Sequence, residues 1–238
     1  MTDRPFHFKH FSLFHHQSTM KVGTDAILLG AWVPVDKVKT ALDIGTGCGI
    51  LGLMLSQRGV PRLEAVELDE LSAAEAKNNF YCSQWRNQLQ VYCLDIRRFA
   101  DEFPVKQYDL IVSNPPFFVN SFKAGQQRRN QARHTDSLSF IDLVSVAKKL
   151  LNPNGTFAVV LPFKEGLAFN ETAKNAGLHL LARQLIIPVE GRHTNRINLL
   201  FSLNPVDKVL SENFTIRHAD GDFTEQYKLA LKDFYLGL

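Results

Sequence analysis

The architecture predicted for this chain depends on one stretch of sequence, Ala41-Leu42-Asp43-Ile44-Gly45-Thr46-Gly47-Cys48-Gly49. An apolar run of strand length leads into three alternating glycines, and a helical pattern follows at once. Glycine lets the backbone approach a ligand closely, because no Cβ intervenes and positive φ angles carry little penalty. A strand, a glycine-rich turn and a helix in this order predict a nucleotide-like ligand at the end of the strand.

Outward from this turn, apolar runs alternate with helical patterns, which is typical of a parallel sheet with crossover helices. The predicted strands are 39–44, 62–69, 88–95, 108–113, 156–161, 178–187 and 196–203. The predicted helices are 50–58, 71–83, 138–151, 164–176 and 222–236, the third of them beginning after the N-cap types Asp136 and Ser137. These elements predict an α/β fold with a doubly wound, mostly parallel seven-stranded sheet, closed by an antiparallel C-terminal hairpin.

Composition limits the class of protein. The 238 residues, 45% of them hydrophobic, can bury one sizeable core, and the net charge of +3 permits a nucleic-acid partner without requiring one. No stretch approaches the roughly 18 consecutive apolar residues of a membrane span, and the N-terminus lacks a signal-peptide pattern. We therefore expect a cytoplasmic protein with no membrane role. The three cysteines, Cys48, Cys82 and Cys93, are predicted to be reduced and buried.

The first 38 residues have a different composition from the rest. Phenylalanines alternate there with histidines: Phe6, Phe8, Phe11, Phe14, His7, His10, His15 and His16. We expect residues 1–38 to form an appendage over the site and residues 39–238 to form a single globular unit. The phenylalanines should cover an edge of the core and the histidines should be solvated. No cysteine or carboxylate joins them at ligand spacing, so no metal is expected.

The glycine spacing also indicates the kind of ligand. It is G-x-G-x-G, whereas the dinucleotide fingerprint is G-x-G-x-x-G, and Asp43 just before the turn would repel a phosphate. A cationic, amino-bearing ligand such as S-adenosylmethionine fits better. Glu67, ending the second strand, could accept hydrogen bonds from ribose hydroxyls, and Asp95, ending the third, from an adenine amine. Any one of these acids taken alone could equally be a loop cap at a strand end.

The fourth strand ends in Asn114-Pro115-Pro116-Phe117. The two prolines hold Asn114 in extended geometry, where its carbonyl oxygen and a proline carbonyl could accept hydrogen bonds from an –NH₂ group. Such acceptors help an exocyclic amine, a poor nucleophile, to attack a methyl group, while Phe117 stacks on the base. In isolation the four residues could be a rigid turn.

Basic residues follow this tetrapeptide closely: Lys123, Arg128, Arg129, Arg133 and His134. A smaller group, Arg192, His193 and Arg196, lies between the sixth and seventh strands. Both groups are candidates for contacts to RNA phosphates, and the alternative for the first group is a solvated loop.

The chain resembles the class I S-adenosylmethionine-dependent methyltransferases, with DIGTGCG as the first motif and N-P-P-F matching the (D/N)-P-P-(Y/F/W) motif of enzymes acting on planar nitrogens. The resemblance implies a Rossmann-like fold and S-adenosylmethionine as cofactor. It also implies catalytic roles for Asn114, Pro115, Pro116 and Phe117. The cofactor residues implied near the turn and the strand ends are Asp43, Gly45, Gly47, Gly49, Glu67, Asp95, Ile96 and Asn114.

Residues 17–32, 132–140 and 231–236 are similar to the bacterial valine-tRNA adenine-37 N6-methyltransferase family. This similarity implies N6-methyladenosine beside the anticodon as the product, and places Lys21, Thr24 and Asp25 beside the cofactor. Thr24 or Asp25 could instead cap a helix. Alternative activities are glutamine N5-methylation of a protein such as a release factor, and N2-guanine or N6-adenine methylation of rRNA. Besides a tRNA substrate, no metal and no obligate protein partner are expected.

Overall fold

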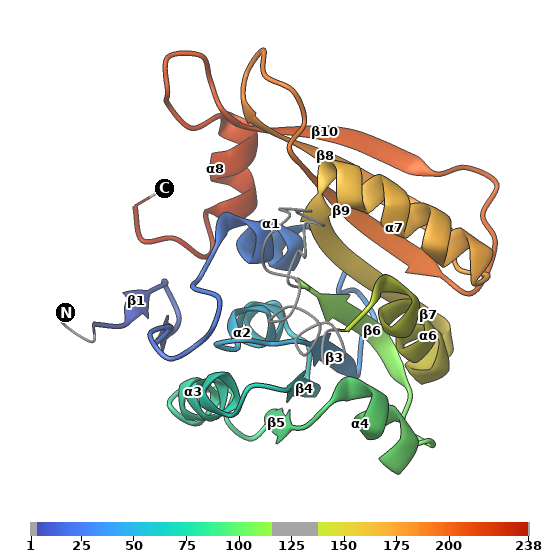
Figure 1. Cartoon of the computed structure of the whole chain (residues 1–238). Coiled ribbons are helices and arrows are strands. Elements are labelled where there is room, and N and C mark those ends of the chain that lie inside the picture. The colour runs from blue at the N-terminus through green and yellow to red at the C-terminus, as the bar shows by residue number, and fades with distance from the viewer. Residues whose placement is uncertain (1–3, 116–137, 238) are drawn as a thin grey trace, which may run out of the picture.

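The computed structural model describes residues 4–115 and 138–237 and contains one central eight-stranded sheet in the order β10-β8-β9-β7-β6-β3-β4-β5 (Figure 1). Only β9 runs antiparallel, to both β7 and β8, while all other neighbours in this sheet are parallel. The strands are β3 (Ala41–Ile44), β4 (Leu63–Glu67), β5 (Leu89–Cys93), β6 (Tyr108–Ser113), β7 (Leu151–Pro162), β8 (His179–Val189), β9 (Arg196–Ser202) and β10 (Leu210–Arg217).

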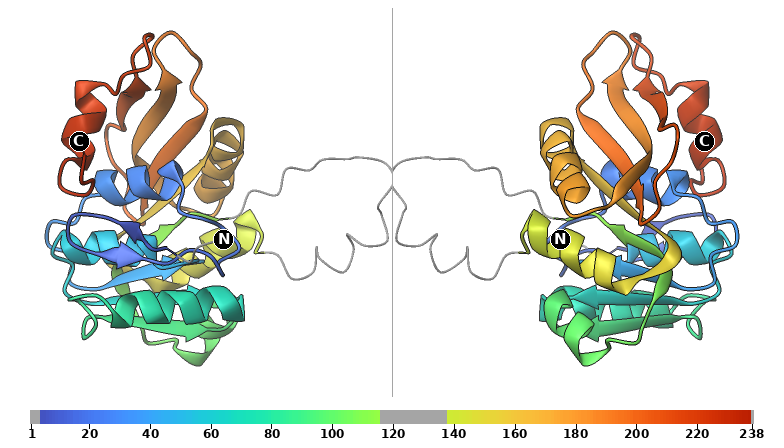
Figure 2. Two further views of the ribbon diagram at one scale, coloured as in Figure 1. Left: turned by 90° about the vertical axis from the view of Figure 1, so that its left-hand side faces the viewer. Right: turned by 90° about the vertical axis from the view of Figure 1, so that its right-hand side faces the viewer.

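Helices cover both faces of the sheet, because side chains alternate along each strand and both sets are apolar. Leu110 and Val112 belong to the core under α1 (Thr24–Trp32), α2 (Ile50–Gln57), α3 (Glu70–Tyr81) and α8 (Glu225–Leu231). Leu42 and Ile111 belong to the core under α4 (Ile96–Glu102), α6 (Phe140–Leu150) and α7 (Phe163–Asn175). Figure 2 shows α8 and α7 on opposite sides of the C-terminal strands. The predicted doubly wound α/β architecture is thereby confirmed.

The seven predicted strands are all present, and β8 and β9 form the expected antiparallel hairpin. The eighth strand, β10, was missed because it lies at the sheet edge with four exposed residues at its start, so its sequence has no continuous apolar run. Helix α4 was missed because its seven residues are too few to show a repeated helical period.

The helix predicted at 138–151 begins at Phe140, where Ser139 is the N-cap and forms a capping box with Asp142. The expected caps Asp136 and Ser137 lie outside the described residues. At the other end of the chain, α8 is shorter than the predicted 222–236 because Thr224 caps it, its side chain accepting a hydrogen bond from the Tyr227 amide.

The N-terminal residues pack onto the rest of the molecule. Two short antiparallel strands, β1 (Phe6–His7) and β2 (Ser12–Leu13), are joined by a turn in which Phe8 and Phe11 are buried. The Phe8 ring stacks on Tyr235, and Phe11 meets Trp85 edge to face. Of the expected solvated histidines, His15 is half-buried, and the other three are exposed.

All three cysteines are free thiols, but only Cys48 is buried; Cys82 and Cys93 are exposed, so the expectation of burial is wrong for them. Cys82 is the C-cap of α3 and Cys93 is the last residue of β5, and both lie at solvent-exposed ends of these elements.

In residues 4–115 and 138–237, no helix is long and apolar enough to cross a bilayer. The same residues contain no cluster of three or more histidine, cysteine, aspartate or glutamate side chains suited to a metal ion.

Candidate active site

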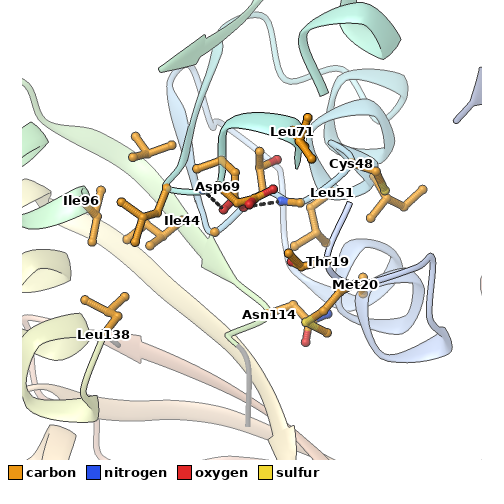
Figure 3. A pocket seen from close by; sticks show the side chains of 18 of the residues that line it. Thr19, Met20, Ile44, Cys48, Leu51, Asp69, Leu71, Ile96, Asn114 and Leu138 are labelled. Carbon is orange, nitrogen blue, oxygen red and sulfur yellow. Dashed lines mark hydrogen bonds between the residues drawn. The ribbon is translucent and has the colours of Figure 1, made fainter. Parts of the chain in front are cut away.

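A cavity of about 690 Å³ opens at the carboxyl edge of the parallel strands. Its walls come from the ends of β3 and β4, the residues that follow β5 and β6, the starts of α2, α3 and α4, and the chain preceding α1 (Figure 3). Of the predicted cofactor residues, the following line it: Lys21, Gly45, Gly47, Glu67, Asp95, Ile96 and Asn114. The cavity volume lies in the range of about 300–1,000 Å³ that is usual for cofactor-sized ligands.

The glycines of the turn have two different functions. Gly45 and Gly47 both have positive φ, and a Cβ on either would meet no atom of the described residues within 4 Å, so their backbone is open to the cavity. Gly49 is the N-cap of α2 at φ 87° and is absent from the cavity wall. A Cβ there would lie 2.6 Å from Cε1 of Phe80. Gly49 is therefore required for close packing of α2 against α3.

Asp43 lies beneath the turn and not on the cavity surface. It is fully buried, and its Oδ2 accepts a hydrogen bond from Thr46 Oγ1 at 2.5 Å. Its Oδ1 has no hydrogen-bond partner among the described residues. Burial raises the pKa of Asp43 to about 7, with a further contribution from the negative charge of Glu67, and the Thr46 hydroxyl opposes the shift. Asp43, a predicted cofactor residue, is therefore absent from the cavity wall in this structure.

Glu67 lies in the cavity wall at the end of β4. One carboxylate oxygen accepts a hydrogen bond from the Gly47 amide at 2.9 Å, and the other accepts one from the Asp69 amide at 3.0 Å. These bonds tie the glycine turn to the β4–α3 connection and fix the orientation of the carboxylate. Each oxygen retains acceptor capacity for a hydroxyl in the cavity.

Asp95 is the N-cap of α4, where it accepts a hydrogen bond from the Arg97 amide at 2.7 Å. The Arg97 side chain also contacts both of its carboxylate oxygens, at 3.0 Å from Nε and 2.5 Å from Nη2. These bonds from Arg97 hold the pKa of Asp95 below its ordinary value. Asp95 is thus a fixed acceptor, beside Ile96 on the same wall.

Asn114 follows β6 directly and its side chain borders the cavity. Its Oδ1 is buried and has no hydrogen-bond partner in the described part of the chain. A buried acceptor without a donor is uncommon in native proteins and calls for a ligand or a water. Pro115 is buried beside it, whereas Pro116 and Phe117 lie outside the described residues.

Residues 14–22, which we call the strap, contain no helix or strand and contribute Thr19, Met20 and Lys21 to the cavity wall. After the strap, Gly23 is the N-cap of α1, so neither Thr24 nor Asp25 caps the helix. Thr24 and Asp25 do not line the cavity; Asp25 instead forms an ion pair with Arg196 at 2.7 Å.

The residues that hold the strap were not found from the sequence. They are Ser72, Glu75 and Asn79, which share one face of α3 and are all buried. The sequence contained one indication of their role. Polar residues occur here at i, i+3 and i+7, the positions at which an amphipathic helix normally buries apolar residues.

The predicted RNA contacts divide into two groups. Lys123, Arg128, Arg129, Arg133 and His134 lie outside the described residues. Arg192 is exposed in the turn between β8 and β9, and Arg196 begins β9. Because β9 runs antiparallel to β7, its first residue lies at the same edge of the sheet as the ends of β6 and β7. Asn114, which follows β6, lies at this edge as well.

Comparison with known proteins agrees with this geometry. Residues 11–171 match the family model described as the methyltransferase small domain. A predicted O-methyltransferase from Agrobacterium tumefaciens superimposes with a TM-score of 0.66 at 16% identity, covering 88% of this chain and 96% of that one. An S-adenosylmethionine-dependent methyltransferase from the same organism gives a TM-score of 0.57 at 15% identity, with coverages of 86% and 71%. The fold and the site thus define a class I methyltransferase.

Much closer relatives exist in sequence. Proteins named tRNA1(Val) (adenine(37)-N6)-methyltransferase are 42% identical in Salmonella typhi, 40% in Serratia proteamaculans and 37% in Parabacteroides distasonis. The matches cover 97%, 97% and 99% of this chain, and 94%, 89% and 99% of the relatives. This chain belongs to the tRNA1(Val) (adenine(37)-N6)-methyltransferase family. The predicted family, the enzyme class and the cofactor, S-adenosylmethionine, are confirmed.

The residues present fit this cofactor. The open glycine backbone provides room for the methionine part, and the acceptors of Glu67 and Asp95 suit ribose hydroxyls and an adenine amine. The carboxylate of Glu67 in the cavity wall favours a positively charged ligand over a phosphate. When bound, the cofactor supplies a methyl group activated by attachment to a sulfonium.

Proposed function

We propose that this protein methylates the N6 amine of adenine 37 in tRNA1(Val), using S-adenosylmethionine. The observation that supports this function best is Asn114 on the cavity wall, whose buried Oδ1 accepts no hydrogen bond from residues 4–115 and 138–237. Asn114 borders the cavity, and an exocyclic amine bound there would supply a donor that the described residues do not provide. The names of the relatives add the tRNA and the position of the base.

In this mechanism Asn114 and the backbone carbonyl of Pro115 accept hydrogen bonds from the amine. These bonds draw electron density away from the ring and stabilise the positive charge that develops on nitrogen. The nitrogen lone pair would take up the methyl group that the cofactor supplies, leaving the sulfur as a neutral thioether, and the surplus amine proton would pass to water. Since the two acceptors and the cofactor are held by rigid elements, much of the rate comes from orientation.

The remaining residue assignments follow from the same proposal. Lys21, Gly45, Gly47, Glu67, Asp95 and Ile96 hold the cofactor, with Asp43 and Gly49 shaping the turn from below. Thr24 and Asp25 act through the start of α1. Pro116 and Phe117 complete the acceptor site. The predicted phosphate contacts are Lys123, Arg128, Arg129, Arg133, His134, Arg192 and Arg196.

We also propose that residues 1–38 serve as the appendage that covers the cofactor site, with residues 39–238 as the catalytic unit. The strap residues on the cavity wall support this division. Because tRNA is the substrate, the cytoplasm is the proposed location.

The test is transfer of labelled methyl from S-adenosylmethionine to a tRNA1(Val) transcript. We expect label recovered as N6-methyladenosine, and none from a matched transcript in which guanine replaces adenine 37. Equal label in both transcripts would contradict the position. Label that appears only in release factor or in ribosomal RNA would replace the proposed substrate with one of the alternative activities.

A further inference from the structure

We propose that Glu75 is a positioning residue for the cofactor: its buried carboxylate fixes the strap so that Thr19, Met20 and Lys21 form one wall of the cavity. The inference rests on the proposed function only in taking this cavity as the S-adenosylmethionine site. Glu75 itself does not line the cavity, so any effect on binding must pass through the strap.

The carboxylate of Glu75 accepts four hydrogen bonds from three consecutive strap residues. Oε1 accepts from the amides of His16 at 2.7 Å and Gln17 at 3.0 Å. Oε2 accepts from the Ser18 amide at 2.9 Å and from the Ser18 hydroxyl at 2.5 Å. Successive backbone N–H groups converging on one anion form an anion-binding nest, and bonds to an ionised acceptor are roughly twice as strong as neutral ones.

Neighbouring residues on α3 extend this attachment in both directions. Ser72 Oγ accepts a hydrogen bond from the Thr19 amide at 3.2 Å. Asn79 accepts one from the Phe14 amide at 2.8 Å and donates to the carbonyls of Phe14 and Cys48. The strap and the glycine turn are therefore tied to the same face of one helix. In Figure 3 Thr19 and Met20 lie beside Asn114, at the part of the cavity where methyl transfer would occur.

The charge on Glu75 explains why the strap stays in place before the cofactor binds. Glu75 is only 6% exposed, and the hydrogen bonds that it accepts, within the described residues, all come from the strap. Although burial opposes ionisation, the bonds from Ser18 and the backbone hold the pKa of Glu75 below its ordinary value. Detaching the strap would leave that charge without its donors, so the wall is preorganised for the ligand.

The experiment compares Glu75→Gln with wild type in the full-length protein. An amide offers one acceptor oxygen and turns an –NH₂ toward strap donors, so the strap should loosen. We expect the Kd for S-adenosylmethionine, measured by calorimetry without RNA, to rise about 10- to 100-fold. The KM for the cofactor should rise similarly. The kcat at saturation should stay within about threefold of wild type, because the variant loses the same binding energy in the ground state and in the transition state. Hydrogen exchange of the amides of residues 16–19 should accelerate.

Glu64→Gln is the matched control. Glu64 is a partly buried carboxylate that, like Glu75, accepts from several donors, in this case Lys106, Tyr92 and Tyr108, but it does not line the cavity or touch the strap. This variant should lose thermal stability while its Kd for S-adenosylmethionine stays within about twofold of wild type. An equal rise in Kd in both variants would overturn the proposal, because it would show a general loss of stability.

An unchanged Kd in a folded Glu75→Gln variant would also overturn it. If that variant does not fold, Ser18→Ala decides the matter, since it removes a single donor: the Kd should rise about two- to fivefold, and an unchanged Kd would reject the positioning role. Failure of the proposed function is distinguishable, because it would appear as no binding of S-adenosylmethionine by the wild type or as no methylation of tRNA.

Discussion

Two carboxylates at the glycine turn, Asp43 and Glu67, differ in environment although their charges interact. Glu67 accepts hydrogen bonds from two backbone amides and reaches the cavity, whereas Asp43 is fully buried with one oxygen unpartnered among the described residues. Burial without enough donors favours the neutral acid. At the residue scale, the turn therefore has one carboxylate directed at the ligand and another that titrates near neutral pH.

Replacing Asp43 by Asn should stabilise the ligand-free protein in a pH-dependent way. The pKa of Asp43 is about 7 in the folded protein and about 3.9 in an unfolded chain, so the folded state loses stability as the pH rises between these values. The advantage of the variant should be larger at pH 8 than at pH 5 by about 2 to 3 kcal/mol. Denaturant unfolding at both pH values measures it, and an equal difference at the two pH values would show that Asp43 does not titrate in this range.

Replacing Asn114 by Ala should remove nearly all turnover, by about 10²- to 10³-fold, as expected for loss of one preorganised polar group at a reacting centre. The Kd for S-adenosylmethionine should change little, because the other cavity residues remain. Asn114→Asp keeps an acceptor oxygen and should retain more activity than the alanine variant. Rapid-quench methyl transfer and calorimetry give the two quantities. Complete loss of cofactor binding in Asn114→Ala would mean that the acceptor site is misassigned.

At the scale of elements, the start of β9 and the start of α1 are coupled. Arg196 and Asp25 are both partly buried, with side-chain exposures of 32% and 24%, and their ion pair joins positions 171 residues apart. The first turn of α1 follows directly on Gly23, which lines the cavity. Arg196, which we propose as a phosphate contact, is therefore also placed to support the cofactor wall, whereas Arg192, four residues earlier, is exposed to solvent.

Arg192→Ala and Arg196→Ala should therefore have different effects. Loss of Arg192 should weaken tRNA binding and reduce the salt dependence of the affinity by about one unit of slope, with no change in thermal stability. Loss of Arg196 leaves the carboxylate of Asp25 without this partner and should reduce the free energy of unfolding by about 1 to 2 kcal/mol. Filter binding across a salt series and thermal melts distinguish them. Equal loss of tRNA affinity with unchanged melting in both variants would show that Arg196 acts mainly on RNA.

At the scale of the whole molecule, a row of polar side chains crosses the C-terminal strands. Asn198 on β9 donates to Gln184 on β8 at 3.0 Å, and Gln184 donates to Glu212 on β10 at 2.8 Å. The three residues are direct partners in the strand register. Trp32 at the end of α1 donates to the same Glu212 oxygen at 2.8 Å. The row fixes the register of β8, β9 and β10 and attaches α1 to them.

Gln184→Ala should break this row at its centre. Gln184 is 4% exposed and Asn198 is fully buried, so the amide donor of Asn198 would lose its partner in the core. The free energy of unfolding should fall by about 2 to 4 kcal/mol. Glu102→Ala, which removes only an exposed pair with Arg98, should change it by no more than about 0.5 kcal/mol. A Gln184→Ala variant as stable as wild type would show that the row does not contribute to the stability of the fold.

The sequence by itself determined the features that depend on neighbours along the chain. Apolar runs, the glycine turn at Gly45 and Gly47, and the acids Glu67 and Asp95 at strand ends follow from local periodicity and backbone sterics, and parallel strands bring their ends to one edge. Tertiary structure alone decided the contacts between distant segments. Glu75 meets residues 57 to 59 positions away, and β10 is a strand only because β8 offers it a hydrogen-bonding edge. Such contacts depend on how helices and strands pack, which no local pattern specifies.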